Sequence, residues 1–181
     1  MHNIIRLKDG DCALCAFRTD KEAINIYLKW MNLSDNTLLF LGQNTSVINY
    51  KDEEEYVNKT DSSHIRFNII SIENDKLIGN CDIALMGNHT SAMLGILIGE
   101  TGYRGHGYGV KAIKLMLKFC FEELGMHRVW LNVNTENNRA IKCYEKAGFK
   151  VCGTEHEVQW ARGRWWDAHH MEILAQDYFK E

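Results

Sequence analysis

Hydrophobic and polar positions follow two different periods along this chain of 181 residues. Short apolar or alternating runs bounded by turn residues predict β-strands, whereas apolar residues three or four positions apart predict helices. Strands are expected over residues 4–7, 13–17, 66–72, 77–85, 91–99 and 128–133, with two more in the tail around a turn at 161–164. Helices are expected over residues 20–32, 52–59, 110–124 and 136–147.

The run 91–99 differs from the other expected strands because almost all of its residues are apolar. A strand with one solvated face alternates, so this run is expected to be central and buried. Strands that alternate with helices predict an α/β fold, here one mixed sheet flanked by helices. The chain contains no proline, no repeat and no low-complexity tract, so no stiff linker divides it.

Length and composition predict a single domain spanning residues 1–181, since 45% hydrophobic residues suffice for one substantial core but not comfortably for two. A net charge of −3 gives no general affinity for nucleic acid. Charged residues from Arg6 to Asp11 interrupt the apolar N-terminus, which excludes a secretory segment there. No apolar run approaches the roughly 18 residues of a membrane span. We therefore expect a cytoplasmic protein with neither a membrane nor a nucleic-acid partner.

Six cysteines raise the question of a metal site or disulfides. Cys12 and Cys15 form one C-x-x-C pair, but no second close pair follows and no histidine lies at zinc-finger spacing. Cys120 falls on the apolar stripe of a helix, and buried free thiols behave as small hydrophobic groups. We expect free cysteines and no metal.

A glycine-rich loop, Arg104 to Gly109, connects the apolar run 91–99 to an amphipathic helix. Glycines allow close backbone approach, and the unpaired N–H groups at a helix start bind anions such as phosphate. Residues 101–121 carry four basic residues and no Asp or Glu. Val110 excludes both a Walker loop, which needs Lys there, and a dinucleotide fingerprint, which needs Gly. The remaining alternatives are a phosphate site and a plain flexible turn.

Four segments together resemble the GNAT superfamily of N-acetyltransferases, in the branch with ribosomal-protein and polyamine acetyltransferases. They are RGHGYG (104–109), HRVWLNVNTENNRAIKCYEKAGF (127–149), WWDAHHMEIL (165–174) and, more loosely, LKWMN (28–32). The resemblance implies a single domain with a mixed, mostly antiparallel twisted sheet, splayed parallel central strands and about four helices. It also implies acetyl-CoA as cosubstrate and direct acetyl transfer to a primary amine. A peptide N-terminus, a polyamine, an amino sugar and an aminoglycoside all stay open as acceptors.

The resemblance also assigns the cosubstrate contacts. The pyrophosphate is expected on the loop residues Arg104, Gly105, His106, Gly107, Tyr108 and Gly109, and the pantetheine amides on the strand backbone at Ile96, Leu97 and Ile98. Asn137 matches an asparagine that contacts pantetheine, with Asn138 as a substitute. A residue of this type also caps helices, and Thr135 is another candidate for that role.

Tyr144 matches the family tyrosine that protonates the departing thiolate. On spacing alone it is indistinguishable from a core tyrosine, because Ala140, Ile141 and Tyr144 form one helical stripe. The base that deprotonates the acceptor ammonium is less clear. Many relatives carry Glu where this chain has Met93. Glu100 is the expected replacement, and Asp82, His89 and a bound water are further candidates.

The sequence does not identify the residues that bind the acceptor amine. Trp30, Trp165 and Trp166 either wall a pocket or fill core. Arg162 and Arg164 beside the tryptophans suit single-stranded nucleic acid, but Gly163 favours a hairpin turn. Asp167 is expected to make a structural hydrogen bond. A non-catalytic acyl-CoA-binding module is the alternative to an enzyme, and a homodimer is left open.

Overall fold

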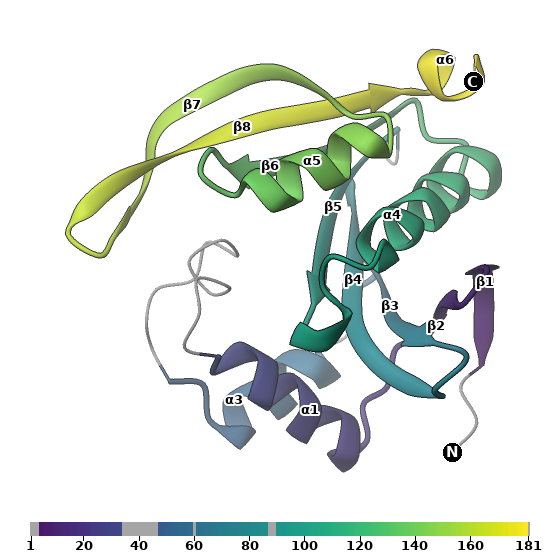
Figure 1. The fold of residues 1–181 in the computed structure, drawn as a ribbon, viewed down its shortest axis with the longest axis vertical. Helices are drawn as coiled ribbons and strands as arrows, with labels where there is room; N and C mark the ends of the chain where they lie inside the picture. The colour runs from purple at the N-terminus through teal and green to yellow at the C-terminus, as the bar shows by residue number, and fades with distance from the viewer. Residues whose placement is uncertain (1–3, 34–46, 60, 87–89, 181) are drawn as a thin grey trace.

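The computed structural model describes residues 4–33, 47–59, 61–86 and 90–180. These residues form one eight-stranded sheet of order β1-β2-β3-β4-β5-β6-β8-β7 (Figure 1). In chain order the strands are β1 (Ile5–Asp9), β2 (Cys12–Ala16), β3 (His64–Ser71), β4 (Lys76–Met86), β5 (Ser91–Ile98), β6 (Arg128–Asn134), β7 (Lys150–Ala161) and β8 (Arg164–Leu174). The expected mixed, mostly antiparallel sheet is confirmed.

The pairing of β5 with β6 is the parallel contact of this sheet, and it is short. It joins Ser91 to Arg128, Ala92 to Val129 and Met93 to Trp130, and goes no further. Antiparallel β4, on the other side of β5, stays paired along the whole of β5, from Ser91 to Ile98. The two central strands therefore separate after Met93, as the family resemblance implied.

Helices cover the sheet in two groups, α1 (Lys21–Met31) with α3 (Tyr50–Asn58), and α4 (Tyr108–Lys118) with α5 (Asn138–Lys146). A short α6 (Ala175–Tyr178) follows β8, and a 3-10 turn, Thr101–Tyr103, precedes the glycine loop. In Figure 1 the α1/α3 pair and the α4/α5 pair lie in separate regions of the molecule, with β4 and β5 between them. No helix of the described residues is long and apolar enough to span a membrane.

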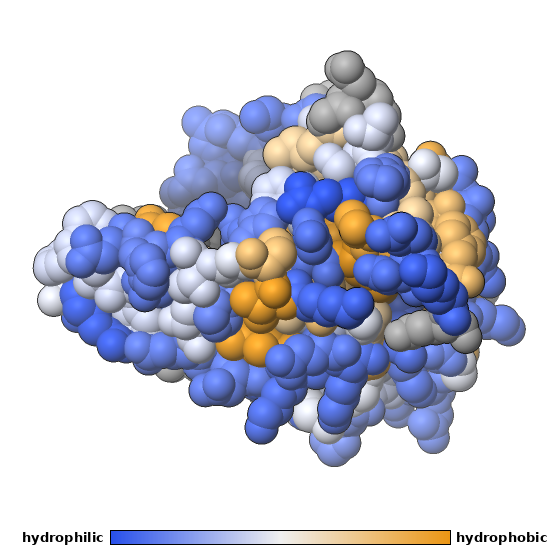
Figure 2. Space-filling view, turned by 90° about the horizontal axis from the view of Figure 1, so that it is seen from above, coloured by the Kyte–Doolittle hydropathy of each residue, from blue (hydrophilic) through white to orange (hydrophobic). Residues whose placement is uncertain are grey.

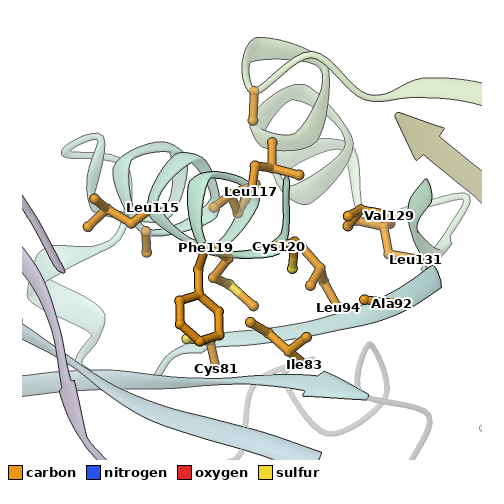
Figure 3. Packing of buried hydrophobic residues seen from close by; sticks show 14 of the residues in the cluster. Cys81, Ile83, Ala92, Leu94, Leu115, Leu117, Phe119, Cys120, Val129 and Leu131 are labelled. Atoms are coloured by element: carbon orange, nitrogen blue, oxygen red, sulfur yellow. The ribbon is translucent and has the colours of Figure 1, made fainter. Parts of the chain in front are cut away.

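Each helix pair packs on its own hydrophobic cluster. The larger cluster joins α4 to the central strands, where Leu115, Leu117 and Phe119 lie over Ile83 and Leu94 (Figure 3). The smaller one joins α1 and α3 to the sheet through Ile24, Tyr27, Trp30 and Leu97. Burial of these apolar side chains is the main favourable contribution to folding. Side chains at alternate positions of β5 enter different clusters.

The four helices and eight strands predicted from the sequence are all present, with two differences. The last turn of the helix after the glycine loop is a π-helix, Phe119–Glu123, in which Leu124 N donates to Phe119 O. It ends before Gly125, whose φ of +66° suits a residue without a side chain. The tail strands are also longer than typical strands, at 12 and 11 residues.

The prediction of a buried central strand was partly wrong. Strand β5 is central, but Gly95 is exposed and Met93, Ile96 and Ile98 are only half-buried. The strand is apolar because its two faces pack against different hydrophobic clusters. Several of its residues are nevertheless partly exposed because β6 does not pair with β5 beyond Met93.

The end of β5 is fixed by an irregularity in β4. Ile69 pairs with Gly79 and Ile70 with Leu77, so Ile78 is an extra residue in the ladder. Ile78 O accepts hydrogen bonds from both Gly99 N and Glu100 N, at 2.9 and 3.1 Å. Beside it, a β-carbon on Gly79 would overlap Leu97 O, so only glycine fits there.

The outer hairpin of β7 and β8 extends beyond the helices (Figure 1). Four of its large apolar side chains are about half exposed: Val151, Val158, Trp160 and Trp165. Elsewhere, on the face seen in Figure 2, hydrophilic residues dominate and hydrophobic ones gather in a few separate patches.

All six cysteines are free, as expected. Cys12, Cys15, Cys81 and Cys120 are buried. Burial raises the pKa of the Cys12 and Cys120 thiols to about 12, which keeps them protonated and unreactive at neutral pH.

Candidate active site

A cavity of about 720 Å³ opens where β5 and β6 separate. Its walls come from β5, from the glycine loop with the start of α4, from β6 and α5, and from the β7/β8 hairpin. Residues predicted as cosubstrate contacts that lie in these walls are Ile96, Leu97, Ile98, Arg104, Gly105, Gly107, Gly109 and Asn137. Tyr144 also lines the cavity.

Beyond Met93, β5 lines the cavity without a paired β6 neighbour. Gly99 N, just past the strand, bonds to Ile78 O on the β4 side. Because backbone groups of a strand alternate in direction, Ile96 and Ile98 turn theirs toward the β6 side, where pairing has already ended. An extended ligand with its own amide groups can pair there like an added strand.

Arg104 stands at the corner between β5 and the loop. Its Nε donates to Ile98 O at 2.8 Å, and its Nη2 to Gly99 O at 3.4 Å. The guanidinium therefore fixes the end of β5 against the glycine loop. A direct contact between Arg104 and phosphate stays a prediction.

Two loop glycines have the backbone that an anion site needs. Gly105 has a φ of +83° and Gly107 a φ of +87°, a left-handed region that disfavours residues with side chains. No heavy atom lies within 4 Å of the place where a β-carbon would stand at either residue, so the space above the loop is open. Gly107 is also the N-cap of α4 and offers no side-chain cap. The first N–H groups of the helix therefore remain available to a phosphate.

The other loop residues have structural roles. A β-carbon on Gly109 would come within 3.1 Å of Cys143 Sγ, so this glycine lets α4 pack closely on α5. The Tyr108 hydroxyl donates to Asp11, and it lies 3.3 Å from Ser71 Oγ. The hydrogen bond to Asp11 raises the pKa of Tyr108. Neither Tyr108 nor exposed His106 belongs to the cavity wall, so the structure brings their backbone near the site but not their side chains.

Tyr144 lies in the cavity wall, on α5. Its side chain is 8% exposed and its ring packs edge-on against Phe149, with the centroids 5.9 Å apart. Burial raises the pKa of its hydroxyl well above the ordinary value, and the neighbouring Cys143 adds to the shift. Within the described part of the chain, the hydroxyl has no hydrogen-bond partner. Tyr144 is thus both a core residue and a protonated donor facing the cavity.

Asn137 combines the two roles considered for it. It is the N-cap of α5, where its Oδ1 accepts from Ala140 N at 3.2 Å, and it lines the cavity. Thr135 is not the cap, since its N–H bonds to Asp167 O at 3.0 Å. Asn138 is the first residue of the helix and lies outside the cavity wall.

Glu100, the expected general base, is not placed for that role. Its Oε1 accepts from Trp30 Nε1 at 3.0 Å and from Lys29 Nζ at 3.3 Å, and its Oε2 lies 2.9 Å from Lys76 Nζ. Burial raises the pKa of Glu100, but these three donors outweigh it and lower the pKa to about 2. A carboxylate with this pKa, whose two oxygens are already bonded to three donors, is a poor proton acceptor.

Asp82 and His89 are the two other side chains considered as the general base. Asp82 lies on β4, where its Oδ2 is 2.7 Å from His64 Nδ1 and its Oδ1 is buried with no partner. His89 lies outside the described residues.

The aromatic residues considered for the acceptor end are mostly structural. Trp30 is fully buried in the α1 core. Trp166 is buried and donates its Nε1–H to Ala161 O at 2.8 Å, while Arg164 stacks on its ring. Gly163 has a φ of +75°, which confirms the hairpin turn.

Gln159 is one of the wall residues that sequence reasoning missed. Between the pairs Glu155–Ala168 and Gln159–Trp166, β7 has three residues opposite Asp167 alone. The Asp167 carboxylate makes the expected structural hydrogen bonds and holds this bulge, accepting from His156 Nδ1 and Glu157 N, both at 2.9 Å. The bulge places Gln159 in the wall, with its Nε2 buried and unpartnered. No sequence pattern marks it, since alternation breaks at the bulge.

Comparison with known proteins decides the family. A family model described as an acetyltransferase (GNAT) domain matches residues 4–150. The chain belongs to the GNAT acetyltransferases. It is 28% identical over 149 residues to the spermidine N(1)-acetyltransferase of Vibrio cholerae, covering 76% of this chain and 86% of that protein. It is also 28% identical over 151 residues to the spermidine N(1)-acetyltransferase of Escherichia coli K12, covering 78% and 81%.

The fold agrees with the same relatives. The crystal structure of the Vibrio cholerae spermidine N-acetyltransferase in complex with CoA and spermine superposes with a TM-score of 0.84 at 25% identity, covering 94% of this chain and 99% of that one. This GNAT protein is therefore an acyltransferase, an N-acetyltransferase whose cosubstrate is acetyl-CoA. The open β5 backbone and the glycine loop fit the two ends of that molecule, its amide-containing arm and its phosphates.

Proposed function

We propose that this acetyltransferase transfers acetyl directly from acetyl-CoA to a primary amine of a small cationic acceptor, and that Tyr144 protonates the departing thiolate. The observation that carries the proposal is the single cavity that joins the glycine loop, the open edge of β5 and the Tyr144 side chain. A module that only bound acyl-CoA would have no use for a proton donor in its cavity wall.

The cosubstrate is positioned by the backbone more than by side chains. The N–H groups at the start of α4, around Gly105 and Gly107, hold the pyrophosphate, helped by the local positive charge. The peptide group of Ile96 and the N–H of Ile98 pair with the amides of the pantetheine arm, while Ile98 O stays bonded to Arg104. Asn137 supplies a further polar contact from the opposite wall.

This arrangement directs the thioester away from the loop and toward Tyr144. The amine nitrogen attacks the thioester carbonyl, the C–S bond breaks, and the sulfur takes a proton from the Tyr144 hydroxyl. The raised pKa of Tyr144 keeps that proton on the oxygen until the thiolate forms.

A polyamine is the acceptor that the observations favour. The relatives named above are spermidine N-acetyltransferases. Charge in the cavity wall is also divided. Basic residues Arg104, Arg139, Lys142 and Lys146 come from the loop and α5, whereas the acidic residues Glu155 and Asp167 come from the β7/β8 hairpin. The basic side suits the CoA phosphates, and the acidic side suits a cationic acceptor.

A panel of amines tests the proposal, with thiol release from acetyl-CoA as the readout. Spermidine and spermine should release thiol well above the rate of acetyl-CoA hydrolysis, and should do so faster than a peptide N-terminus, an amino sugar or an aminoglycoside. Faster release with one of those amines would overturn the polyamine assignment. Tight CoA binding without release for any amine would overturn catalysis and favour an acyl-CoA-binding module.

A further inference from the structure

We propose that Asp82 takes the proton from the acceptor amine and that His64 positions it, an assignment that rests on the proposed function. Direct transfer needs such a group, because an ammonium has no lone pair to attack with. Met93 carries no titratable group, and Glu100 is held outside the cavity by Trp30, Lys29 and Lys76.

Asp82 lies beside the part of β5 where the acyl end of the cosubstrate belongs. In the antiparallel pair it stands opposite Gly95, a residue of the cavity wall. A β-carbon on Gly95 would be 3.9 Å from Asp82 Cβ, so both positions share one face of the sheet. Because Gly95 has no side chain, β5 places only backbone between Asp82 and the cavity at this pair.

The order of contacts along β5 places the thioester near that point. The glycine loop follows the strand, so a molecule with its phosphates on the loop runs back past Ile98 and Ile96 toward Gly95. Leu97, which shares the face of Gly95, packs in the α1/α3 core, whereas Tyr144 packs in the α4 core. Asp82 and Tyr144 therefore approach from opposite faces of the sheet, one toward the attacking nitrogen and one toward the sulfur.

The hydrogen bonds of Asp82 leave one oxygen free for the amine. Its Oδ2 accepts from His64 Nδ1 at 2.7 Å, which fixes the carboxylate. Its Oδ1 is buried and has no partner in the described residues. An unpaired buried acceptor costs free energy, and an ammonium N–H would supply the missing hydrogen bond.

The nearest cation does not neutralise this carboxylate. Arg66 is the cross-strand partner of Asp82 on β3. Its guanidinium is turned to the end of α3, where it donates to Tyr56 O at 3.1 Å and to Lys59 O at 2.7 Å and stacks on the Tyr56 ring. Arg66 is thus engaged at the end of α3, and no ion pair joins it to Asp82 among the described residues.

Three other titratable groups lie around the sheet face that carries Asp82. Asp61 Oδ2 lies 3.9 Å from His64 Nε2. On α3, the buried Glu53 has a raised pKa because of desolvation, and Tyr56 has a raised pKa because of burial and the negative charge of Asp82.

The proton balance of the whole reaction closes with these groups. An ammonium that becomes an amide loses two protons, and the CoA sulfur gains one. Asp82 accepts the first proton from the ammonium before the C–N bond forms and later releases it to solvent. The second proton from nitrogen balances the one that Tyr144 gives to the thiolate, after Tyr144 is reprotonated through water.

The test compares Asp82→Asn with the wild type, using the best amine of the panel, over a range of pH. Loss of a general base lowers kcat by about 10² to 10⁴. We expect this loss at neutral pH with unchanged CoA affinity, and recovery as the pH rises and the amine loses its proton without help. An acceptor that is neutral at pH 7, such as hydroxylamine, should be acetylated by Asp82→Asn at nearly the wild-type rate.

The positioning role of His64 has its own variants. In His64→Asn the amide Nδ2 can replace the Nδ1 donor, whereas His64→Leu removes it, so His64→Asn should keep the wild-type pH profile and His64→Leu should lose it. The matched control is Asp9→Asn, an exposed carboxylate on β1, which should behave as wild type. If Asp82→Asn does not fold, Asp82→Glu keeps the charge and should retain the pH profile at reduced kcat.

The outcomes separate this assignment from the proposed function. A wild-type protein that acetylates no amine refutes the proposed function itself. An active wild type with an unchanged kcat and pH profile in Asp82→Asn overturns the role of Asp82 alone. Equal losses for basic and neutral amines in a folded Asp82→Asn would also overturn it, because a base is needed only for the protonated acceptor.

Discussion

Gly99 lies directly against the indole ring of Trp30, so closely that a β-carbon at residue 99 would overlap the ring. Trp30 is fully buried and its Nε1–H is bonded to Glu100. The ring therefore cannot shift to make room. This contact ties α1 to the end of β5, just before the glycine loop.

Gly99→Ala should therefore be destabilising. Forcing extra volume into a packed site costs about 1 to 3 kcal/mol. We expect a decrease of this size in the free energy of unfolding, measured by urea denaturation. The control is Gly102→Ala, where no heavy atom lies within 4 Å of the new β-carbon. Equal stability of the two variants would contradict the contact.

Glu100→Gln separates the structural role of Glu100 from catalysis. The pKa of Glu100 is about 2 in the folded protein against an ordinary 4.5, so its ionised form stabilises the fold above pH 4.5, and this contribution is lost as the pH falls toward 2. The free energies of unfolding of wild type and Glu100→Gln should differ at pH 6 and converge on acidification. Turnover at neutral pH should fall by less than about tenfold, below the range of a lost general base. A larger loss would restore Glu100 as the base.

Gly107→Asn tests the phosphate site with little risk to the fold, because Asn tolerates a positive φ better than other residues with side chains. The new side chain occupies the open space above the loop. Loss of a charge-assisted hydrogen bond costs about 1.5 to 3 kcal/mol, so the Kd for CoA should rise at least about tenfold in calorimetry. Gly125→Asn is the matched control, since Gly125 also has a positive φ and open space but lies outside the cavity wall. Equal affinity in both variants would rule out this loop as the phosphate site.

Tyr144→Phe keeps the ring and its packing on Phe149. Because the hydroxyl has no partner in the described residues, thermal stability should hardly change. If the hydroxyl serves the thiolate, kcat at saturating substrates should drop by at least about tenfold, toward the 10² to 10⁴ range of general acids, while CoA affinity is retained. Tyr178→Phe removes a hydroxyl bonded to Glu122, far from the cavity wall, and should leave kcat unaltered. Normal turnover in Tyr144→Phe would make Tyr144 a core residue only.

Sequence periodicity predicted almost the whole fold because each strand and helix buries an apolar face. The glycines also marked turns correctly, since Gly105, Gly107 and Gly163 all adopt positive φ. The candidate cosubstrate site followed from local order, as the strand, the loop and the helix are consecutive. Seven of the expected contacts there, from Ile96 to Gly109, do line the cavity.

Three features of the site could not be predicted because each depends on contacts between segments that are distant in the sequence. Glu100 is drawn out of the site by Trp30, Lys29 and Lys76, and no local pattern records that meeting. The pairing of His64 with Asp82 depends on the register of β3 and β4, including the extra residue Ile78. Gln159 enters the wall only because of the bulge opposite Asp167.

The short ladder between β5 and β6 gives the sheet two edges in its interior. An unpaired strand edge normally invites pairing with another chain. Here both edges face each other across the cavity, where they are shielded from other proteins and only a slender molecule with its own amide groups can reach them. In the binding mode proposed above, the cosubstrate takes the place of a missing strand segment, and the gap in the hydrogen-bonding pattern is the feature that selects it.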